Sequence, residues 1–283
     1  MIEVKIKKLN KSKRHHYLPQ FYLEYFCING CLWLFDKKNK EYRIQTPINT
    51  TLKSYYYSLE DEKGQKGAQI ESFLSKIEGF AKPIIQKINS GNNITSEEKE
   101  KLSIFIAFMM NRVPEFEKSV NDIENHLIKK FAKFIFSDEK RTQAILDRYD
   151  KSTGTKDDTN VKEVMEFFKS NNFDIEVPRS ESLRLMVELS IELAAYFTQM
   201  DWVFYHAPQK ASFVTTDNPV IIVPPKNRKN FYSRGITTPG ARKIFPLSQS
   251  ACLIMYDHGD IAKHVKINEE TTQEISSLIS LSF

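Results

Sequence analysis

The chain has 283 residues, of which 41% are hydrophobic and 27% are charged, and its formal net charge is +5. This balance is ordinary for a folded globular protein, and nine glycines against twenty phenylalanines exclude collagen-like character. The three cysteines form no Cys-x-x-Cys pair, which argues against a disulfide framework and a zinc knuckle.

The chain shows no apolar signal core at its start and no apolar run of membrane-spanning length. We therefore expect a cytoplasmic protein without a membrane partner. Residues 1–14 carry six basic residues and one acidic residue. Such a segment is either a solubilising tail or an arm that contacts phosphates.

Residues 14–26 form the densest stretch, with two imidazoles and five aromatic rings in the run RHHYLPQFYLEYF. The apolar spacing predicts a helix, and Pro19 suits its first turn. His15 and His16 would then lie just before a helix N-terminus, which favours anions. A phosphate or proton-transfer site is one interpretation, and helix capping is the other.

Short runs rich in apolar, aromatic and β-branched residues, separated by turn residues, predict strands at 31–35, 42–45 and 54–59, and again at 202–206, 212–216, 220–223 and 251–256. Helical spacing predicts helices at 70–88, 97–110, 116–135, 141–149, 161–168, 178–197 and 269–281. The order predicts one α+β domain over 1–283. It would have a composite, mostly antiparallel sheet from both ends (1–66 and 201–283) and a large helical insertion (67–200).

Four motifs follow one another along the chain: His16-Tyr17-Leu18-Pro19-Gln20-Phe21-Tyr22-Leu23, Asn111-Arg112-Val113-Pro114, Thr216-Asp217-Asn218-Pro219-Val220 and Phe245-Pro246-Leu247-Ser248. In order and spacing they resemble a bacterial family known only as a domain of unknown function, number four-two-three-eight. The resemblance extends from His15 to about Ser250. It implies a one-module bacterial protein and no established reaction.

Because the resemblance repeats both the His-His-Tyr stretch and the Asp217-Asn218 turn, we expect these segments to converge. The expected catalytic set consists of His15, His16, Gln20, Arg112, Asp217 and Asn218. Such a set could activate water and hold a phosphate, with a divalent metal ion left open as a cofactor. The alternative is a buried polar network that joins the two ends of the chain. For Arg112 alone, a structural partner is favoured over a ligand anion.

The segment 226–243 has six basic residues, no acidic one, and two aromatic rings. Basic residues interleaved with aromatics suit single-stranded nucleic acid, whereas a solvated loop is the plainer interpretation. The expected nucleic-acid contacts are Arg14, Lys226, Arg228, Lys229, Phe231, Tyr232, Arg234, Arg242 and Lys243. The triplet Asp36-Lys37-Lys38 has a weak likeness to part of a nuclease motif, but it lies in an expected hairpin turn.

Two hypotheses follow. The first is a hydrolase that acts on a phosphodiester or nucleotide, nuclease-like, in bacterial stress or phage defence. The second is a noncatalytic module that binds nucleic acid or a protein partner. The residues determine neither the substrate nor the oligomeric state, and no Gly-x-Ser-x-Gly, phosphate-binding glycine-rich or His-Glu-x-x-His motif occurs.

Overall fold

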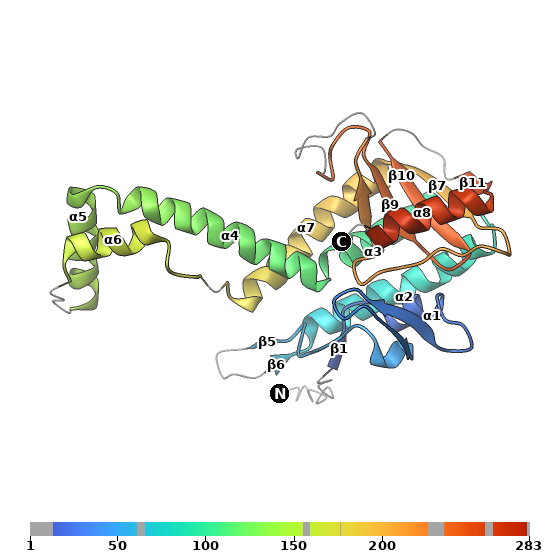
Figure 1. Ribbon diagram of the computed structural model, residues 1–283, viewed down its shortest axis with the longest axis horizontal. Coiled ribbons are helices and arrows are strands. Elements are labelled where there is room, and N and C mark those ends of the chain that lie inside the picture. Colours follow the sequence, from blue (N-terminus) through green and yellow to red (C-terminus); the bar gives the residue numbers. More distant parts are fainter. Residues whose placement is uncertain are drawn as a thin grey trace, which may run out of the picture. The chain divides into compact units, whose positions relative to one another are not determined.

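The computed structural model describes residues 14–60, 66–154, 159–175, 177–225, 235–257 and 263–281. It confirms the predicted α+β class, with strands towards both ends of the chain and a block of helices between them (Figure 1). The chain divides into two compact units, one of residues 1–116 and 183–283 and one of residues 117–182. The helical block is thus shared between them. No helix in the described segments is long and apolar enough to cross a membrane.

A five-stranded sheet forms the centre of the larger unit. Strand β10 (Ala251–Tyr256) pairs antiparallel with β7 (Asp201–His206) and with β9 (Arg242–Pro246). β8 (Ile221–Val223) pairs antiparallel with β9, and β11 (Lys263–Lys266) runs parallel to β7. The predicted mostly antiparallel pairing is therefore confirmed at this end of the chain.

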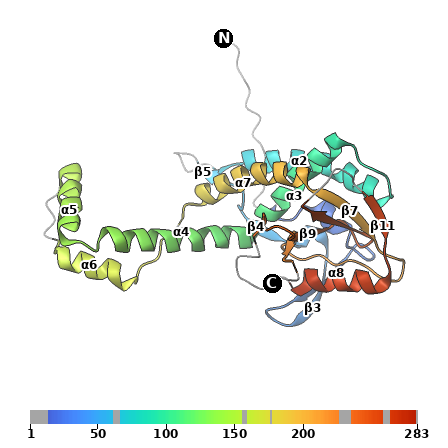
Figure 2. The ribbon, with the colours of Figure 1, turned by 90° about the horizontal axis from the view of Figure 1, so that it is seen from above.

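Helices cover both faces of this sheet. Helix α8 (Glu269–Leu281) lies on one face, and α2 (Gln69–Asn89), α3 (Ser96–Asn111) and α7 (Arg179–Gln199) lie on the other (Figures 1 and 2). Successive side chains along each strand point to opposite faces of the sheet, so alternate residues pack against the two helical layers. The face towards α8 buries Ile221, Ile244, Cys252 and Ile254, in one cluster with Ile275 and Ile279 of α8. The opposite face buries Trp202, Phe204, Phe245, Leu253 and Met255.

Phe245 is the point where the N-terminal segment meets this sheet. The ring of Tyr22 stacks on it at 5.4 Å between centroids, and the ring of Phe105 meets it edge-on at 6.2 Å. Tyr22 belongs to α1 (Gln20–Glu24) and Phe105 to α3. One hydrophobic core therefore joins elements from the beginning, the middle and the end of the chain.

The N-terminal strands form three separate two-stranded ribbons, β1–β4, β2–β3 and β5–β6. Their bounds are Arg14–His16 with Leu52–Ser54, Leu32–Asp36 with Glu41–Gln45, and Leu59–Glu60 with Lys66–Gly67. The short 3-10 helix η1 (Pro47–Asn49) follows β3. The two ends of the chain thus share a core, while the described strands of the two ends form no common hydrogen-bonded ladder.

Several predicted elements differ from the structure. No strand spans 54–59, because the chain turns at Tyr55 to Tyr57 after β4, and residues 212–216 are also irregular. Strands β9 and β11 were not predicted. The two histidines lie on β1 and not at a helix start, so the prediction of an anion-binding helix N-terminus beside them is wrong.

The smaller unit contains most of α4 (Pro114–Ile135), with α5 (Glu139–Thr153) and α6 (Val161–Ser170). Phe136 and Phe168 stack at 4.1 Å between ring centroids where α4, α5 and α6 meet. The segment after α6 returns along α4, where Asp174 accepts a hydrogen bond from Lys129 at 2.8 Å.

Candidate functional site

His15 is held inside the larger unit by groups that are distant in sequence. Its side chain is 3% exposed, and its Nδ1 accepts the backbone N–H of Tyr57 at 2.9 Å. The Tyr57 ring lies parallel to the imidazole, with 5.7 Å between centroids. On the other side, Nε2 lies 3.5 Å from the carboxylate of Glu71 on α2. Both ring nitrogens therefore face protein groups, and a substrate has no direct access to them.

Arg112 follows the buried helix α3 and is itself 3% exposed. Its guanidinium donates to Glu78 Oε1 at 2.7 Å, to the backbone carbonyl of His16 at 3.0 Å and to Tyr57 Oη at 3.1 Å. Burial acts to lower the pKa of Arg112, but Tyr57 and Glu78 together raise it. The charge is therefore retained and paired with protein groups, which is the structural alternative that the sequence favoured.

Of the two adjacent histidines, His16 is the one with access to solvent. Its imidazole is half-buried, and Nδ1 donates to the carbonyl oxygen of Thr50 at 3.0 Å. Burial lowers the pKa of His16, with Arg112 and Arg14 acting in the same direction against Thr50 and Glu78. The neutral imidazole with the proton on Nδ1 leaves Nε2 as an acceptor. Within the described segments no group is hydrogen-bonded to Nε2.

The Asp217 turn lies near the first motif. Burial raises the pKa of Tyr17 to about 12, and the carboxylate of Asp217 adds to the increase. Tyr22 Oη lies 2.7 Å from Thr215 Oγ1, just before this turn, and donates to the carbonyl of Pro246 at 2.9 Å. Because Arg112 of the second motif also contacts the His16 carbonyl, all four sequence motifs are brought together, although the first and third meet mainly through tyrosine hydroxyls.

Gln20 and Asn218 occupy different surroundings. Gln20 is exposed and lines a shallow groove of about 470 Å³ with Glu24, Cys27, Gly30, Thr46, Pro47 and Ile48. None of the other five proposed catalytic residues lines this groove. Asn218 carries a buried Oδ1 to which no described group donates a hydrogen bond. Among the described residues, no cluster of three or more His, Cys, Asp or Glu side chains could hold a metal ion.

The expected nucleic-acid contacts have different outcomes. Lys226, Arg228, Lys229, Phe231, Tyr232 and Arg234 lie outside the described residues. Arg14 is exposed at the start of β1, and Arg242 is half-buried at the start of β9, close to Tyr256.

Lys243 requires a correction, because its side chain is fully buried. Its Nζ donates to Ala241 O at 3.0 Å, to Tyr196 Oη at 3.1 Å and to Asp257 Oδ1 at 3.2 Å. Residue 243 lies on the same strand face as Phe245, which points into the core. Lys243 therefore stabilises the start of β9 and is not a surface contact for phosphates.

A surface that the sequence did not single out lies on the β2–β3 hairpin. Its outer face carries Trp33, Phe35, Tyr42 and Ile44, which we call the aromatic ribbon. These side chains are 64%, 51%, 77% and 58% exposed. Trp33 is opposite Ile44 and Phe35 is opposite Tyr42 in the strand register, and the rings of Phe35 and Tyr42 are 4.9 Å apart. The inner face carries Leu32, which is buried.

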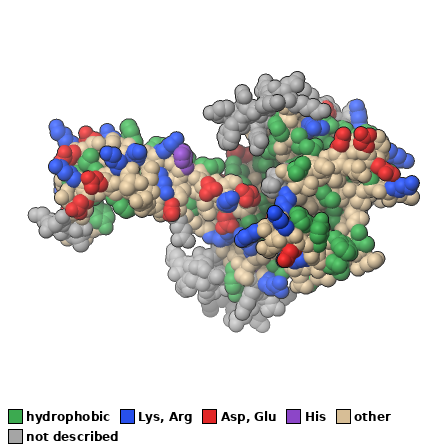
Figure 3. Space-filling view, viewed as in Figure 1, with side chains coloured by type: hydrophobic (Ala, Val, Ile, Leu, Met, Phe, Trp, Pro, Cys, Tyr) green, Lys and Arg blue, Asp and Glu red, His purple; other side chains and the backbone are tan. Residues whose placement is uncertain are grey.

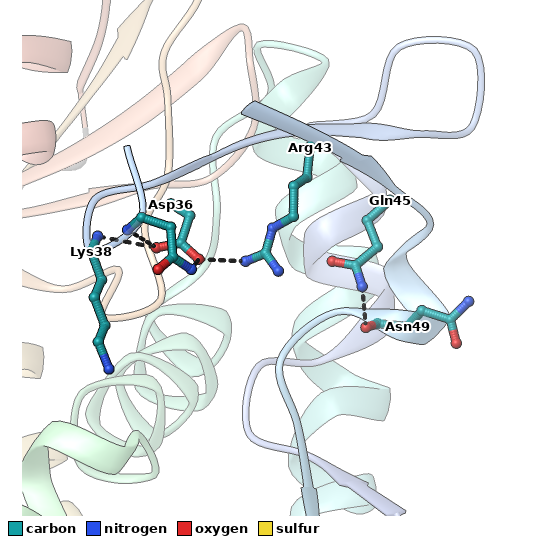
Figure 4. Close-up of polar contacts among 6 residues, drawn as sticks. Asp36, Lys38, Arg43, Gln45 and Asn49 are labelled. Atoms are coloured by element: carbon teal, nitrogen blue, oxygen red, sulfur yellow. Dashed lines mark hydrogen bonds and ion pairs between the residues drawn. The ribbon is translucent and has the colours of Figure 1, made fainter. Parts of the chain in front are cut away.

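The tip of the hairpin is held by Asp36. Its Oδ1 accepts the backbone N–H groups of Lys38 and Asn39 at 3.0 and 3.1 Å, and Arg43 donates to Oδ2 at 3.0 Å (Figure 4). The Asn39 N–H and the Arg43 charge lower the pKa of Asp36. The Asp36-Lys37-Lys38 triplet therefore serves the turn, while the side chains of Lys38 and Lys40 are exposed.

Comparison with known proteins gives a family. The family described as "Protein of unknown function (DUF4238)" matches residues 14–280. No curated protein and no solved structure matches the chain. The match covers nearly the whole sequence and includes all four motifs, in agreement with the resemblance inferred from them. The chain therefore belongs to the family of proteins of unknown function DUF4238.

Proposed function

We propose that this protein binds single-stranded nucleic acid through the aromatic ribbon of the β2–β3 hairpin. The observation that carries the proposal is the exposure of Trp33, Phe35 and Tyr42 on one face of two paired strands. Bases stack on exposed aromatic rings whatever their sequence, because every base has a π-face. Sheets that bind RNA use two or three exposed aromatics in this way.

The geometry of a strand suits such stacking. Trp33 and Phe35 are two residues apart on one strand and so lie about 7 Å apart on the same face. Tyr42 lies opposite Phe35 on the neighbouring strand. The three rings therefore form a platform on which two or three successive bases can stack.

The charge around the ribbon favours a polyanion over a neutral partner. Lys38 and Lys40 are exposed at the hairpin tip, and Arg43 is paired with Asp36 across it. Exposed cations beside a stacking platform supply the sequence-independent attraction to phosphates. The net charge of +5 acts in the same direction.

Trp33 provides a direct readout. The chain has two tryptophans, and Trp33 is 64% exposed whereas Trp202 is fully buried. Stacking of a base on Trp33 should quench the exposed component of the intrinsic fluorescence. Titration with labelled single-stranded and double-stranded RNA and DNA should give tighter binding of the single strands, and this affinity should fall as salt rises.

Variants test the ribbon itself. Trp33→Ala should weaken binding by a factor of roughly 5 to 150, because stacking contributes about 1–3 kcal/mol per base. Trp33→Phe should retain most of the affinity. Tyr149→Ala removes a 57% exposed ring from α5 and is the matched control. Absence of single-strand binding, or equal affinities of Trp33→Ala and Tyr149→Ala, would contradict the proposal.

Hydrolysis of a phosphodiester is the second candidate, and one observation favours it. His16 keeps an acceptor nitrogen and partial access to solvent beside the charges of Glu78 and Arg112. In that case we expect a bacterial stress or phage-defence setting, and metal-dependent cleavage of labelled RNA or DNA.

His16→Asn separates catalysis from structure, because the asparagine amide can still donate to Thr50 O while Nε2 is lost. A general base at His16 predicts loss of cleavage at an unchanged melting temperature, whereas a structural role predicts that His16→Ala alone is destabilised. Undiminished cleavage by the Asn variant, or no cleavage by the wild-type protein, would exclude this candidate.

A further inference from the structure

The outer face of the β2–β3 hairpin continues into the shallow groove beside α1. Thr46 follows β3 directly, and its backbone is extended, with φ -80° and ψ 150°. The alternation of the strand therefore places its side chain on the outer face, after Tyr42 and Ile44. Thr46 also lines the groove to which α1 contributes Gln20 and Glu24. One continuous surface thus leads from the aromatic ribbon into the groove.

The groove is large enough for one base. Its volume of about 470 Å³ falls within the range of small-molecule sites, about 300–1,000 Å³. Cys27, Pro47 and Ile48 contribute apolar atoms to its lining, which suit the flat faces of a base. Figure 3 shows that hydrophobic side chains reach the surface of the larger unit at several places, beside acidic and basic ones. The polar groups of the groove therefore distinguish it from other surface, and they determine what it selects.

The wall of the groove formed by residues 46–48 is fixed before any ligand binds. Gln45 Nε2 donates to the carbonyl oxygen of Asn49 at 3.0 Å (Figure 4), and Asn49 Nδ2 donates to Thr46 Oγ1 at 3.2 Å. Thr50 Oγ1 donates to the carbonyl oxygen of Thr46 at 2.9 Å. Because these hydrogen bonds already order the wall, a base that binds against it orders little more of the chain.

Gln20 and Glu24 form the polar edge of the groove. They lie four residues apart on α1 and are both exposed, so their side chains share one face of the helix. Burial raises the pKa of the Cys27 thiol, and the Cys31 thiol and the Glu24 carboxylate add to the increase, which places this carboxylate near the Cys27 side of the groove. Among the described residues, none forms a hydrogen bond or ion pair with the side chain of Gln20 or Glu24. The amide and the carboxylate therefore remain available to a ligand.

The chemistry of these two groups selects among the bases. A carboxylate accepts hydrogen bonds and donates none, whereas an amide side chain does both. A base that satisfies Glu24 and Gln20 together presents two neighbouring donors with an acceptor beside them. The Watson–Crick edge of guanine has this order, with the 2-amino group, N1–H and the O6 acceptor. Adenine and cytosine present one amino donor next to an acceptor, and uracil presents one N–H between two acceptors.

We propose that the groove is a guanine-binding subsite next to the aromatic ribbon. The Glu24 carboxylate accepts the N1–H and 2-amino hydrogens of the base, and the Gln20 amide donates to O6. The inference rests on the proposed binding of single-stranded nucleic acid and adds the base that the strand carries at this position. The negative charge of Glu24 repels phosphates, so a base edge and not the backbone occupies the groove.

Oligomers that differ in one base test this selection. An oligouridine is compared with the same oligomer carrying one central guanosine, adenosine or inosine, and Trp33 fluorescence reports binding. We expect the guanosine oligomer to bind tighter than the adenosine oligomer by a factor of roughly 5 to 150, which is the discrimination that a bidentate contact with a base edge provides. Inosine lacks the 2-amino group and should lose most of this preference.

Two glutamate variants assign the selection to the groove. Glu24→Gln should bring the ratio of the guanosine and adenosine affinities close to one, because an amide replaces one acceptor oxygen by a donor. Glu166→Gln removes the same charge from an exposed position on α6 and is the matched control, which should keep the wild-type ratio. A ratio near one in the wild-type chain, or an unchanged ratio in Glu24→Gln, would overturn the guanine subsite and leave the aromatic ribbon standing. Absence of single-strand binding would overturn both proposals.

Discussion

Replacing Arg112 by methionine tests whether the polar network around the first motif holds the larger unit together. Methionine keeps much of the side-chain volume and removes the charge and every donor. The change leaves Glu78 Oε1, Tyr57 Oη and the His16 carbonyl without the hydrogen bonds they receive at 2.7, 3.1 and 3.0 Å. Glu78 belongs to α2, His16 to β1, and Tyr57 to the turn after β4.

The expected loss in the free energy of unfolding depends on how far the Arg112–Glu78 ion pair is shielded from solvent. The side chain of Arg112 is 3% exposed and that of Glu78 is 26% exposed. Removing one partner of a buried pair costs about 3–5 kcal/mol, because the remaining charge stays buried without compensation. Glu78 keeps some contact with water, so the lower end of that range applies. We expect a loss of about 3 kcal/mol in the free energy of unfolding.

Lys101→Met is the matched control, because Lys101 lies on the same helix in an exposed pair with Glu97 at 2.5 Å. An exposed i,i+4 pair contributes about 0.3–0.5 kcal/mol. Urea denaturation followed by far-ultraviolet circular dichroism should show a large drop in the midpoint for Arg112→Met, with an unchanged slope. Equal midpoints for the two variants would refute the reasoning, since Arg112 would then be solvated in the folded protein.

Two further predictions concern buried titratable groups. Burial lowers the pKa of His16, His206 and His264 from 6.5, so the folded state binds these protons less readily than the unfolded state. Stability should therefore be full above pH 6.5 and should fall as the pH drops below it, and a double His206→Asn, His264→Asn variant should show a shallower fall. A stability that is flat between pH 7 and 5 would contradict this. Lys243→Met should cost about 3 kcal/mol because it removes the buried ammonium group that pairs with the carboxylate of Asp257, which is 19% exposed. Thermal denaturation measures this loss, and Arg242→Met, at a half-buried position, is the control. Similar melting temperatures of the two variants would contradict the burial of Lys243.

The helical part of this fold could be predicted from local patterns. Thr95 and Glu98 form the capping box that their spacing indicates, and the apolar helix that follows is buried at Leu102, Phe105 and Phe108. These signals lie within one or two turns of the residues that they govern. The strands were harder to predict: β11 is short and exposed, and it pairs in parallel with a strand about sixty residues earlier.

Whether each candidate site residue is buried or exposed depends on partners that are far away in the sequence. His15 is buried because the Tyr57 N–H and Glu71 meet it, and no local pattern records either contact. For Lys243, the alternation with Phe245 could have indicated an inward position once β9 was identified as a strand. The run Leu32 to Phe35 suggests a strand buried on both faces, and only the structure shows that one face lacks a cover.

The hydroxyl of Tyr22 has a consequence for how the chain is made. It bridges Thr215 and Pro246, which lie 193 and 224 residues further along the sequence. During synthesis α1 leaves the ribosome long before either partner has been made. Until then, Tyr22 and its apolar neighbours lack part of the core against which they pack. Contacts of such long sequence separation slow folding and expose the nascent chain to aggregation. Truncation before β9 should therefore yield an insoluble chain.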